Sequence, residues 1–349
     1  MKIASFTVCL LSLGLSLTTC SKEELTLCND DMALHLLADF PIGAAVSTDL
    51  LLYHDKYRNI TKTQFNRISG ETAWLYGRVH PYRDVYDWRD YDTLVRFAER
   101  YNKDVVGHSL VYHDYLPDWL LNFSGSRSDW EAVLKDHVQT IVSRYKGKID
   151  TWIVVNEAFN EDGTLRNSIW KEHIGPSYIA KAFRWAHEAN PNATLFYNEY
   201  NLALNRNKLD AVLRLLKTLK TNGVPIHGLG CQLHIYSEFP EVEDINEMAL
   251  KVQQHDLLVY YSEIDISLNL YGKHDAPTSD MLMQQKRKLK GLVKGYKRLD
   301  PAYQFGISFW NIADADTWIR PNFNRIDWPC MWDDHYEPKP MYCGIKEAL

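Results

Sequence analysis

The sequence predicts a single (β/α)8 barrel, in which eight parallel strands form a closed ring and each strand is followed by a helix. Short apolar runs typical of strands alternate with helical patterns along the chain. Eight such units follow one another at an average spacing of about 38 residues. The first apolar run, residues 42–47, lacks the Gly-rich turn typical of an open doubly wound sheet, so the barrel is preferred to that alternative.

Eight apolar runs mark the expected strands. They begin near Gly43, Asn66, Val105, Thr151, Leu195, Leu229, Leu258 and Gly306. No linker or low-complexity tract separates these runs, which favours one domain of roughly 320 residues. Because such a barrel places its functional side chains at the C-terminal ends of the strands, polar residues at the ends of these runs are the first candidates for a site.

The segments between the expected strands have apolar residues at helical spacing. The predicted buried faces are formed by Tyr91, Leu94, Val95, Ala98 and Tyr101, by Val133, Leu134, Val138, Ile141 and Val142, and by Leu209, Val212, Leu213, Leu216 and Leu219. Ser128 and Glu131 match an S-x-x-E capping box before the second of these helices. The basic run 286–298 also has an apolar face, so it is interpreted as a solvated helix and not as a binding patch.

The composition excludes several classes of protein. Of the 349 residues, 46% are hydrophobic, 13% aromatic and 24% charged, which is typical of an ordered globular protein. The net charge of −6 and the lack of a basic stripe argue against a nucleic-acid partner. Six Cys without a CxxC pair exclude metal fingers and disulfide scaffolds. For Cys28, Cys231, Cys330 and Cys343 the pairing stays open, and free buried thiols are the default expectation.

Polar residues interrupt the apolar runs where the expected strands end. Residues 152–157 end in Asn156 and Glu157, and residues 259–265 contain Glu263 and Asp265. The sixth run ends in Gln232 and His234, and the eighth ends in Trp310 and Asn311. A carboxylate at the end of a buried strand costs folding free energy unless it has a charged or hydrogen-bonding partner, so such a residue is either paired or functional. Two carboxylates from different strands can converge over the barrel mouth and cleave a glycosidic bond as acid/base and nucleophile.

Simpler interpretations of these residues remain open. Glu157 alone could be a surface residue that caps a strand, and Glu263 with Asp265 could form a buried ion-pair cluster. The addition of His234 favours the chemical interpretation, because a His–carboxylate chain can orient Glu263 and keep it ionised. The chain has no HExxH or His-x-His pattern and no G-x-S-x-G elbow, so we expect neither a metal site nor a serine triad.

Six motifs occur in one order along the chain and resemble glycoside hydrolase family 10, the xylanases. They are residues 107–113 (GHSLVYH), 152–157 (WIVVNE), 197–201 (YNEYN), 230–234 (GCQLH), 262–265 (SEID) and 308–311 (SFWN). The resemblance implies a retaining mechanism with Glu157 as general acid/base and Glu263 as nucleophile, their carboxyl groups about 5–5.5 Å apart. It implies a polysaccharide or oligosaccharide substrate and no cofactor, because two carboxylates suffice for this chemistry.

The resemblance also implies roles for other residues. Asn156 would bind the sugar hydroxyl next to the reacting carbon, an interaction that strengthens in the transition state. The reacting sugar would be surrounded by His108, Gln232 and His234, with Trp310 and Trp318 as an aromatic wall. Tyr200 would lie on the leaving-group side, while Glu71 and Tyr112 would contact sugar on the glycone side. Asp265 would support His234.

The chain departs from the family pattern at the glycone side. The family's second-strand motif, Glu-Asn-x-x-Lys, is represented by Glu71, Thr72 and Leu75, so the amide and the cation are missing. Tyr112 stands where the family has Trp, and Asp114-Tyr115 replaces the polar pair that follows. We therefore expect the distal glycone subsite to bind plain xylan less tightly. The open alternatives are a hydrolase of β-glucan or another β-glycan, and a catalytically silent surface glycan-binding protein.

The first residues are predicted to be an export signal. Lys2 precedes an apolar run over residues 3–17 that is too short for a membrane span. Residues 17–24 resemble a lipoprotein signal of the Bacteroidetes-like type with Cys20 as the lipidated first residue, and plain secretion is the alternative. We therefore expect a signal at 1–19, an N-terminal extension at 20–36 and the catalytic barrel at 37–349. The expected product is a monomer that is periplasmic, secreted or held at the outer membrane or cell surface, touching a membrane only through its anchor.

Overall fold

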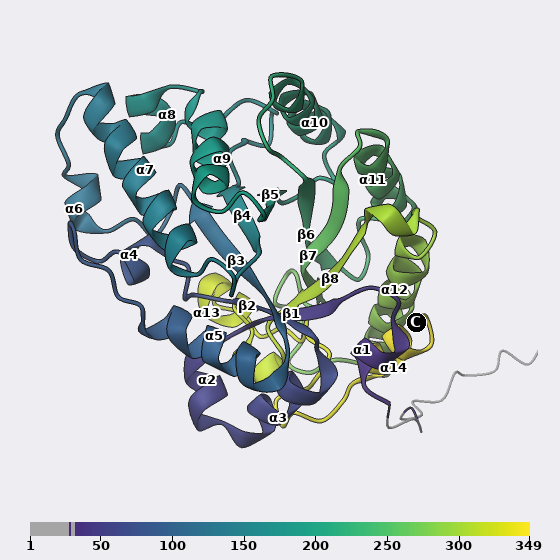
Figure 1. The fold of residues 1–349 in the computed structure, drawn as a ribbon. Helices are drawn as coiled ribbons and strands as arrows, with labels where there is room; N and C mark the ends of the chain where they lie inside the picture. Colours follow the sequence, from purple (N-terminus) through teal and green to yellow (C-terminus); the bar gives the residue numbers. More distant parts are fainter. Residues whose placement is uncertain (1–27, 29–31) are drawn as a thin grey trace, which may run out of the picture.

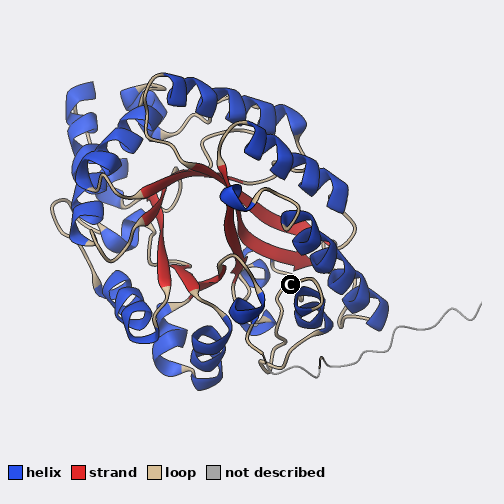
Figure 2. Ribbon diagram, turned by 45° about the vertical axis from the view of Figure 1, so that its right-hand side comes forward, coloured by secondary structure: helices blue, strands red, loops and turns tan. Residues whose placement is uncertain are grey.

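The computed structural model describes residue 28 and residues 32–349, so the expected export signal and Cys20 lie outside the described residues. Eight parallel strands close into a barrel in the order β1-β2-β3-β4-β5-β6-β7-β8. Figure 2 shows the ring of strands enclosed by helices. The predicted (β/α)8 barrel is therefore confirmed.

The strands begin close to their predicted starts. They are β1 (Ile42–Val46), β2 (Arg67–Gly70), β3 (Asp104–Val111), β4 (Thr151–Asn156), β5 (Thr194–Glu199), β6 (Gly228–Tyr236), β7 (Leu258–Ser267) and β8 (Gln304–Trp310). β1 pairs in parallel with both β2 and β8, which closes the ring. The register shifts near the ends of β3, β4, β6 and β7, and such irregularities re-aim side chains at a barrel rim.

Helices of different length follow the strands and surround the ring (Figure 1). They are α1 (Leu34–Leu37), α2 (Thr48–Tyr53), α3 (Asp55–Gln64), α4 (Tyr76–Val79), α5 (Arg89–Tyr101), α6 (Asp118–Leu121), α7 (Arg127–Arg144), α8 (Ile169–Ile174), α9 (Tyr178–Ala189), α10 (Arg206–Thr221), α11 (Val242–Gln254), α12 (Ser279–Tyr296), α13 (Ile319–Phe323) and α14 (Pro340–Lys346), with the short 3-10 helices η1 (Pro301–Tyr303) and η2 (Asp314–Asp316). The basic run 286–298 lies mostly in α12, whose apolar face is buried as predicted.

The predicted capping box of α7 is wrong by two residues. Ser126, not Ser128, is the N-cap residue, and its partner is Asp129, not Glu131. The Ser126 hydroxyl accepts the Asp129 backbone N–H while the Asp129 carboxylate accepts the Ser126 N–H at 2.8 Å. Asp at the third helical position therefore replaces the expected Glu, and the helix begins earlier.

The apolar core has a large part and a small part. The large part lies between the strands and the surrounding helices. The small part is formed by Val106, Ile153, Phe196 and Tyr260. Val106 lies two residues before His108 on the same face of β3, so this cluster fills the barrel interior beneath the mouth. The mouth of the barrel is thus left for polar groups.

One disulfide joins the two ends of the described chain. Cys28 and Cys343 are bonded, with their Cα atoms 5.3 Å apart. The expectation of free thiols is therefore wrong for this pair and right for Cys231 and Cys330, which are buried and unpaired in the described chain. Cys28 precedes α1, which packs beside α14, so the fold brings together cysteines 315 residues apart.

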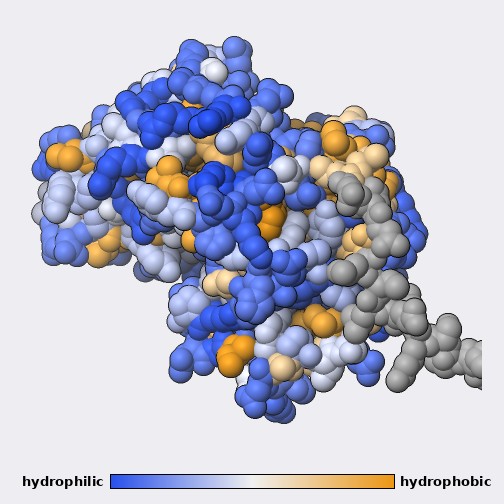
Figure 3. All heavy atoms as spheres, turned by 90° about the horizontal axis from the view of Figure 1, so that it is seen from below, coloured by the Kyte–Doolittle hydropathy of each residue, from blue (hydrophilic) through white to orange (hydrophobic). Residues whose placement is uncertain are grey.

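The surface is mainly polar. Figure 3 shows one face that is mostly hydrophilic, with apolar side chains in small, separate spots. Within residues 32–349, no helix combines the length and the apolar character that crossing a bilayer requires.

Candidate active site

An open cleft of about 510 Å³ lies over the mouth of the barrel. Its walls are formed by Glu71, Thr72, Trp74, Leu75, His108, Tyr112, Asp114, Tyr115, Asn156, Glu157, Tyr200, Asn201, Gln232, His234, Tyr236, Glu263, Trp310, Trp318, Asn322 and Phe323. Every site residue predicted from the sequence within the described chain lines this cleft, except Asp265, which lies behind His234.

The two central carboxylates share an unusual backbone conformation. Glu157 has φ of 55° and Glu263 has φ of 58°, both in the left-handed region that residues other than Gly seldom adopt. Glu157 directly follows β4, and Glu263 lies in β7 where its register with β8 shifts. Strain of this kind persists where the surrounding structure enforces it, and it clusters at functional sites. Both residues also line the cleft over the barrel mouth.

Glu157 is half-buried and accepts hydrogen bonds from three side chains. The Gln232 and Asn156 amides donate to Oε1 at 3.1 and 3.2 Å, and the Tyr112 hydroxyl donates to Oε2 at 3.2 Å. Burial raises the pKa of Glu157 to about 7, with a further rise from the negative charge of Glu263, against the lowering by Gln232 and Tyr112. A carboxyl with this pKa retains a proton near neutrality and can donate it.

Glu263 lies in the opposite electrostatic environment. Asn198 donates to its Oε1 at 2.7 Å, His234 Nε2 lies 3.2 Å from Oε2, and His108 Nε2 lies 3.6 Å from Oε1. Burial alone would raise the pKa of Glu263, but these neighbours reverse the effect and lower it. Glu263 is therefore ionised under conditions that leave Glu157 protonated.

His234 is held by a second carboxylate. Its Nδ1 lies 2.7 Å from Asp265 Oδ2, and the Trp318 indole N–H donates to the same oxygen at 2.7 Å. Although burial would lower the pKa of His234, Asp265 and Glu263 raise it to about 10. The resulting imidazolium stabilises the negative charge of Glu263.

Two amides connect the carboxylates. Asn198 donates both to Glu263 and, at 2.8 Å, to the side-chain oxygen of Asn156, whose amide in turn donates to Glu157. A pair of carboxylates with divergent pKa values in one cleft supplies a proton donor and an anionic nucleophile or base. The site can therefore perform acid–base chemistry with covalent catalysis at an acetal carbon.

Aromatic rings surround the histidines at the cleft walls. The His108 ring lies 4.7 Å from Trp74 and 5.6 Å from Trp310, measured between ring centroids. His234 lies 4.8 Å from Trp318 and 6.1 Å from Trp310. Flat apolar walls edged by imidazole, amide and carboxylate groups match the apolar faces and hydroxyl rim of a sugar.

Comparison with known sequences gives the family. The profile described as "Glycosyl hydrolase family 10" matches residues 32–348. The chain belongs to this family. It is 33% identical over 332 residues to "Endo-1,4-beta-xylanase B" of Thermotoga neapolitana, covering 92% of each chain. It is 36% identical over 317 residues to "Beta-1,4-xylanase" of Dictyoglomus thermophilum, covering 88% of this chain and 87% of the other.

Solved structures agree with this assignment. Xylanase 10B from Thermotoga petrophila, in complex with xylobiose, matches with a TM-score of 0.86 and 33% identity over 91% of this chain and 97% of the other. A family 10 structure from Paenibacillus barcinonensis matches with a TM-score of 0.87 and 30% identity over 91% of this chain and 97% of the other. The protein is thus a glycoside hydrolase of family 10 with a complete family barrel over the described residues.

Asn198, which joins the two carboxylates of this family 10 hydrolase, was not among the site residues predicted from the sequence. Asn198 lies within one of the six motifs, but its type alone did not distinguish it from its neighbours. It is fully buried at the end of β5, and Ser262 fixes its amide by donating to Oδ1 at 2.7 Å. A buried amide at the end of an apolar strand was the available signal.

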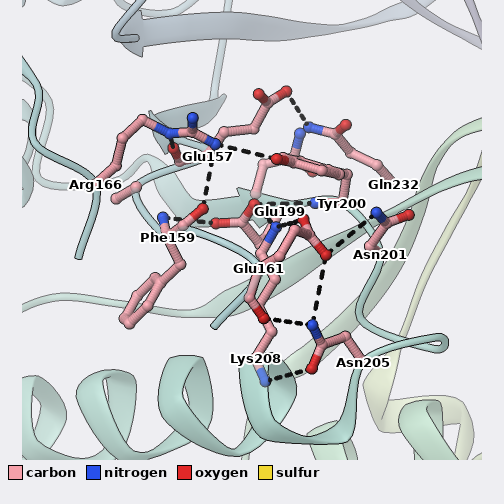
Figure 4. A network of polar contacts seen from close by, with 12 residues as sticks. Glu157, Phe159, Glu161, Arg166, Glu199, Tyr200, Asn201, Asn205, Lys208 and Gln232 are labelled. Carbon is pink, nitrogen blue, oxygen red and sulfur yellow. Dashed lines mark hydrogen bonds and ion pairs between the residues drawn. The ribbon is translucent and has the colours of Figure 1, made fainter. Parts of the chain in front are cut away.

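A second polar network lies behind Glu157 in this hydrolase (Figure 4). Arg166 donates to the Glu157 backbone oxygen at 3.1 Å, to the Phe159 oxygen at 3.2 Å and to the Tyr200 hydroxyl at 3.1 Å. Tyr200, predicted on the leaving-group side, is thereby tied to the backbone of Glu157.

A buried ion pair supports the other side of Tyr200. Lys208 and Glu199 are both fully buried, and their charged atoms lie 3.0 Å apart. The Lys208 ammonium also lies 3.4 Å from the centre of the Tyr200 ring and 3.0 Å from Glu161. Because burying an unpaired charge is costly, this pair fixes the loop that contains Tyr200. Neither Lys208 nor Arg166 was predicted, since neither lies in a motif.

No cluster in the described part of the chain groups three or more His, Cys, Asp or Glu side chains as a metal site would.

Proposed function

We propose that this family 10 hydrolase cleaves β-1,4-xylan-type polysaccharide by double displacement, with retention of anomeric configuration. The observation that supports this most directly is the pair Glu157 and Glu263, one with its pKa raised to about 7 and the other with its pKa lowered, in a single aromatic-walled cleft. The curated relatives, which are named xylanases, support the choice of substrate class.

In the proposed first step, a Glu263 carboxylate oxygen attacks the anomeric carbon and forms an ester. The bond from that carbon to the leaving oxygen breaks, and Glu157 gives its proton to this oxygen. In the second step, Glu157 takes a proton from a water molecule, which attacks the anomeric carbon and releases Glu263 as the carboxylate. Each group then returns to its starting state, and one glycosidic bond has been hydrolysed.

Other residues in the cleft are proposed to hold the sugar. Asn156, fixed between Asn198 and Glu157, would bind the hydroxyl next to the reacting carbon. Gln232 donates to both Asn156 and Glu157 at 3.1 Å and would orient the acid. His108, His234, Trp310 and Trp318 would surround the reacting sugar, Tyr200 would contact the leaving group, and Glu71 would contact the glycone.

We expect Tyr112→Phe to move the alkaline limb of the kcat/KM–pH profile to higher pH. The Tyr112 hydroxyl donates to Glu157 and stabilises its ionised form, so losing this donor raises the pKa of the acid. A hydrogen bond of ordinary strength corresponds to a shift of about 0.4–1 pH unit. The profile is measured on xylotetraose, with Tyr115→Phe as the matched control. An unmoved limb, or a shift to lower pH, would show that Tyr112 does not tune Glu157.

The distal glycone subsite is proposed to differ from that of plain-xylan enzymes. Thr72 and Leu75 line the cleft. They stand where the family motif has an amide and a cation, and they would form the glycone end. None of the described residues that line the cleft is Lys or Arg. Losing a hydrogen bond from a charged group costs roughly 1.5–3 kcal/mol. The apolar side chain of Leu75 suits a decorated, methylated or otherwise altered sugar at this position.

Leu75→Lys is expected to raise kcat/KM on linear xylo-oligosaccharides by about tenfold or more, because it restores a charged donor to the distal sugar. The comparison variant is Leu75→Met, which changes the side chain without adding charge. Steady-state kinetics on xylotetraose measure the effect. Equal kcat/KM values for the two variants would show that the missing cation at position 75 does not limit activity on linear xylo-oligosaccharides.

Export of the chain is also proposed. Residues 1–19 would be the signal, Cys20 the lipidated residue, 20–36 an extension and 37–349 the catalytic domain. The Cys28–Cys343 disulfide supports this, because disulfides persist in oxidising compartments outside the cytosol. The scattered exposed apolar side chains fit a monomer that touches a membrane only through its anchor.

A polysaccharide panel tests the proposed reaction. Linear xylan, arabinoxylan, glucuronoxylan, mixed-linkage glucan and soluble cellulose are incubated with residues 21–349 and with the Glu263→Ala variant, and the products are separated by size. Xylo-oligosaccharides from the wild type alone are expected. Products from glucan would change the proposed substrate class to β-glucan and leave the proposed mechanism unchanged. The absence of products with retained binding in affinity gels would indicate a glycan-binding protein.

A further inference from the structure

The segment that carries Glu157 leaves β4 as residues 157–159, and β5 accepts hydrogen bonds from all three of its backbone N–H groups. These groups donate to the Asn198 backbone oxygen and the Tyr197 hydroxyl, each at 2.9 Å, and to the Glu199 carboxylate at 3.2 Å. The Tyr197 hydroxyl itself donates to the Glu199 carboxylate at 2.6 Å. One side of the segment is therefore fixed by a strand of the barrel.

The opposite side of the segment is fixed by a single residue, Arg166. Its Nε donates to the Glu157 backbone oxygen at 3.1 Å, its backbone N–H to the Ala158 oxygen at 2.7 Å and its Nη2 to the Phe159 oxygen at 3.2 Å. Ala158 and Phe159 are buried, so water cannot readily replace a partner that their carbonyl groups lose. Arg166 thus satisfies three consecutive carbonyl groups at the acid, two of them through its side chain.

The Arg166 guanidinium also holds a second residue of the cleft (Figure 4). Its Nη2 donates to the Tyr200 hydroxyl at 3.1 Å, and Tyr200 lines the cleft. The Lys208 ammonium lies 3.4 Å from the centre of the Tyr200 ring, so this ring is fixed at its face as well as at its hydroxyl. Because the hydroxyl accepts the bond from Arg166, it can still donate its own proton to a sugar.

Arg166 places a positive charge behind the acid. Burial lowers the pKa of Arg166, but Tyr200, Glu157 and Glu199 raise it, and the net result is a higher pKa. This attraction acts on both partners, so the guanidinium also favours the ionised form of Glu157. Arg166 is not among the described residues that line the cleft, so it acts on a substrate through other residues.

We infer that Arg166 is a positioning residue that aims the Glu157 carboxyl at the leaving oxygen and holds Tyr200 against the leaving-group sugar. The inference rests on the proposed function and adds to it the residue that sets the direction of the proton donor. Glu157 has φ of 55°, a conformation that its surroundings must enforce. The bonds from Arg166 to the Glu157 and Phe159 oxygens enforce it from the side opposite β5.

Arg166→Lys tests the inference, because lysine keeps the charge but lacks the planar fork of donors that reaches several acceptors. The substrates are xylotetraose and a series of aryl β-xylobiosides, whose leaving groups range from dinitrophenol, which is acidic, to phenol, which is weakly acidic. Loss of a hydrogen bond from a charged group is expected to lower kcat/KM on xylotetraose about 10- to 100-fold. Ester formation from the dinitrophenyl substrate should be almost as fast as in the wild type, because its leaving group needs no proton.

The pH profile separates the position of Arg166 from its charge. Arg166→Lys retains the charge, so the alkaline limb of kcat/KM on xylotetraose should stay at the pH of the wild type. Arg166→Gln removes the charge, so the pKa of Glu157 should rise and the limb should move to higher pH. A limb that stays in place in Arg166→Gln would overturn the assignment of Arg166 as a residue that acts on Glu157.

A double-mutant comparison tests the link through Tyr200. Tyr200→Phe removes the hydroxyl that accepts the bond from Arg166. Since both residues act through this bond, the loss of kcat/KM that Tyr200→Phe causes on xylotetraose should be smaller in the Arg166→Lys background than in the wild-type background. Equal losses in the two backgrounds would overturn the link.

Arg184→Lys is the matched control for the change from arginine to lysine. Arg184 lies on α9, donates to the Asn222 backbone oxygen at 3.1 Å and is not among the described residues that line the cleft, so its substitution should leave the kinetics unchanged. An equal loss in Arg166→Lys on every leaving group, or no loss on xylotetraose, would overturn the inference while the wild type still cleaves xylan. Failure of the wild type to cleave xylotetraose and the aryl xylobiosides would overturn the proposed function as well.

Discussion

Glu263→Gln is expected to lower kcat/KM on xylo-oligosaccharides by about 10,000-fold or more. The substituted amide has nearly the same shape and can still contact Asn198 and His234, but it cannot form the ester with the anomeric carbon. Steady-state kinetics, with active-site titration to exclude wild-type contamination, measure the loss.

Two further variants make this prediction specific to the nucleophile. Glu71→Gln removes another carboxylate from the same cleft and should lower kcat/KM by about 10- to 100-fold, the effect of losing one binding contact of a charged group. Glu263→Ala leaves space for a small anion, so azide should restore turnover and give a glycosyl azide of inverted configuration. A Glu263→Gln variant within tenfold of the wild type would contradict the assignment.

Glu157→Ala is expected to slow cleavage in proportion to how much the leaving group needs a proton. On xylo-oligosaccharides, whose leaving oxygen is basic, kcat/KM of the variant should be about 100- to 10,000-fold lower than that of the wild type. On a dinitrophenyl xylobioside, whose leaving group is acidic, the variant should form the ester almost as fast as the wild type. Burst kinetics on the two substrates separate the steps.

The pH dependence of Glu157→Ala gives an independent check. In the wild type, activity should fall as pH rises through about 7, because Glu157 then loses the proton that it must donate. At lower pH, activity should fall as Glu263 becomes protonated, and its lowered pKa places this limb on the acid side. The alkaline limb should vanish in Glu157→Ala. Equal losses on both leaving groups, with the limb retained, would contradict the role of Glu157 as acid.

Much of the fold was predictable because its elements have strong local patterns. The eight apolar runs start within two residues of the observed strands, since buried parallel strands are continuous apolar segments. The predictions that were wrong concern details that depend on single hydrogen bonds or on packing between segments far apart in the sequence. The N-cap of α7 is Ser126 and not the predicted Ser128, because the Asp129 carboxylate accepts the Ser126 N–H. The disulfide was not predicted because it depends on the packing of α1 beside α14.

The site was predictable at the level of which residues face the cleft. Polar residues at strand ends identified Glu157, Glu263 and His234, because a barrel gathers these ends at one mouth. The sequence could not reveal which partners each carboxylate would have. Asn198, which joins the two halves of the site, became evident only from distances, and so did the contact of Tyr112 with Glu157. Partners of this kind depend on side-chain direction, which residue type does not determine.

Trapping of the covalent intermediate tests the central claim most directly. The protein is incubated with a dinitrophenyl 2-deoxy-2-fluoro-β-xylobioside, whose fluorine slows breakdown of the ester more than it hinders its formation. Mass spectrometry of the intact protein should show one added fluoroxylobiosyl group, and peptide sequencing should locate it on Glu263. A label on any other residue, or hydrolysis of xylan by an enzyme that never becomes labelled, would contradict a retaining mechanism through Glu263.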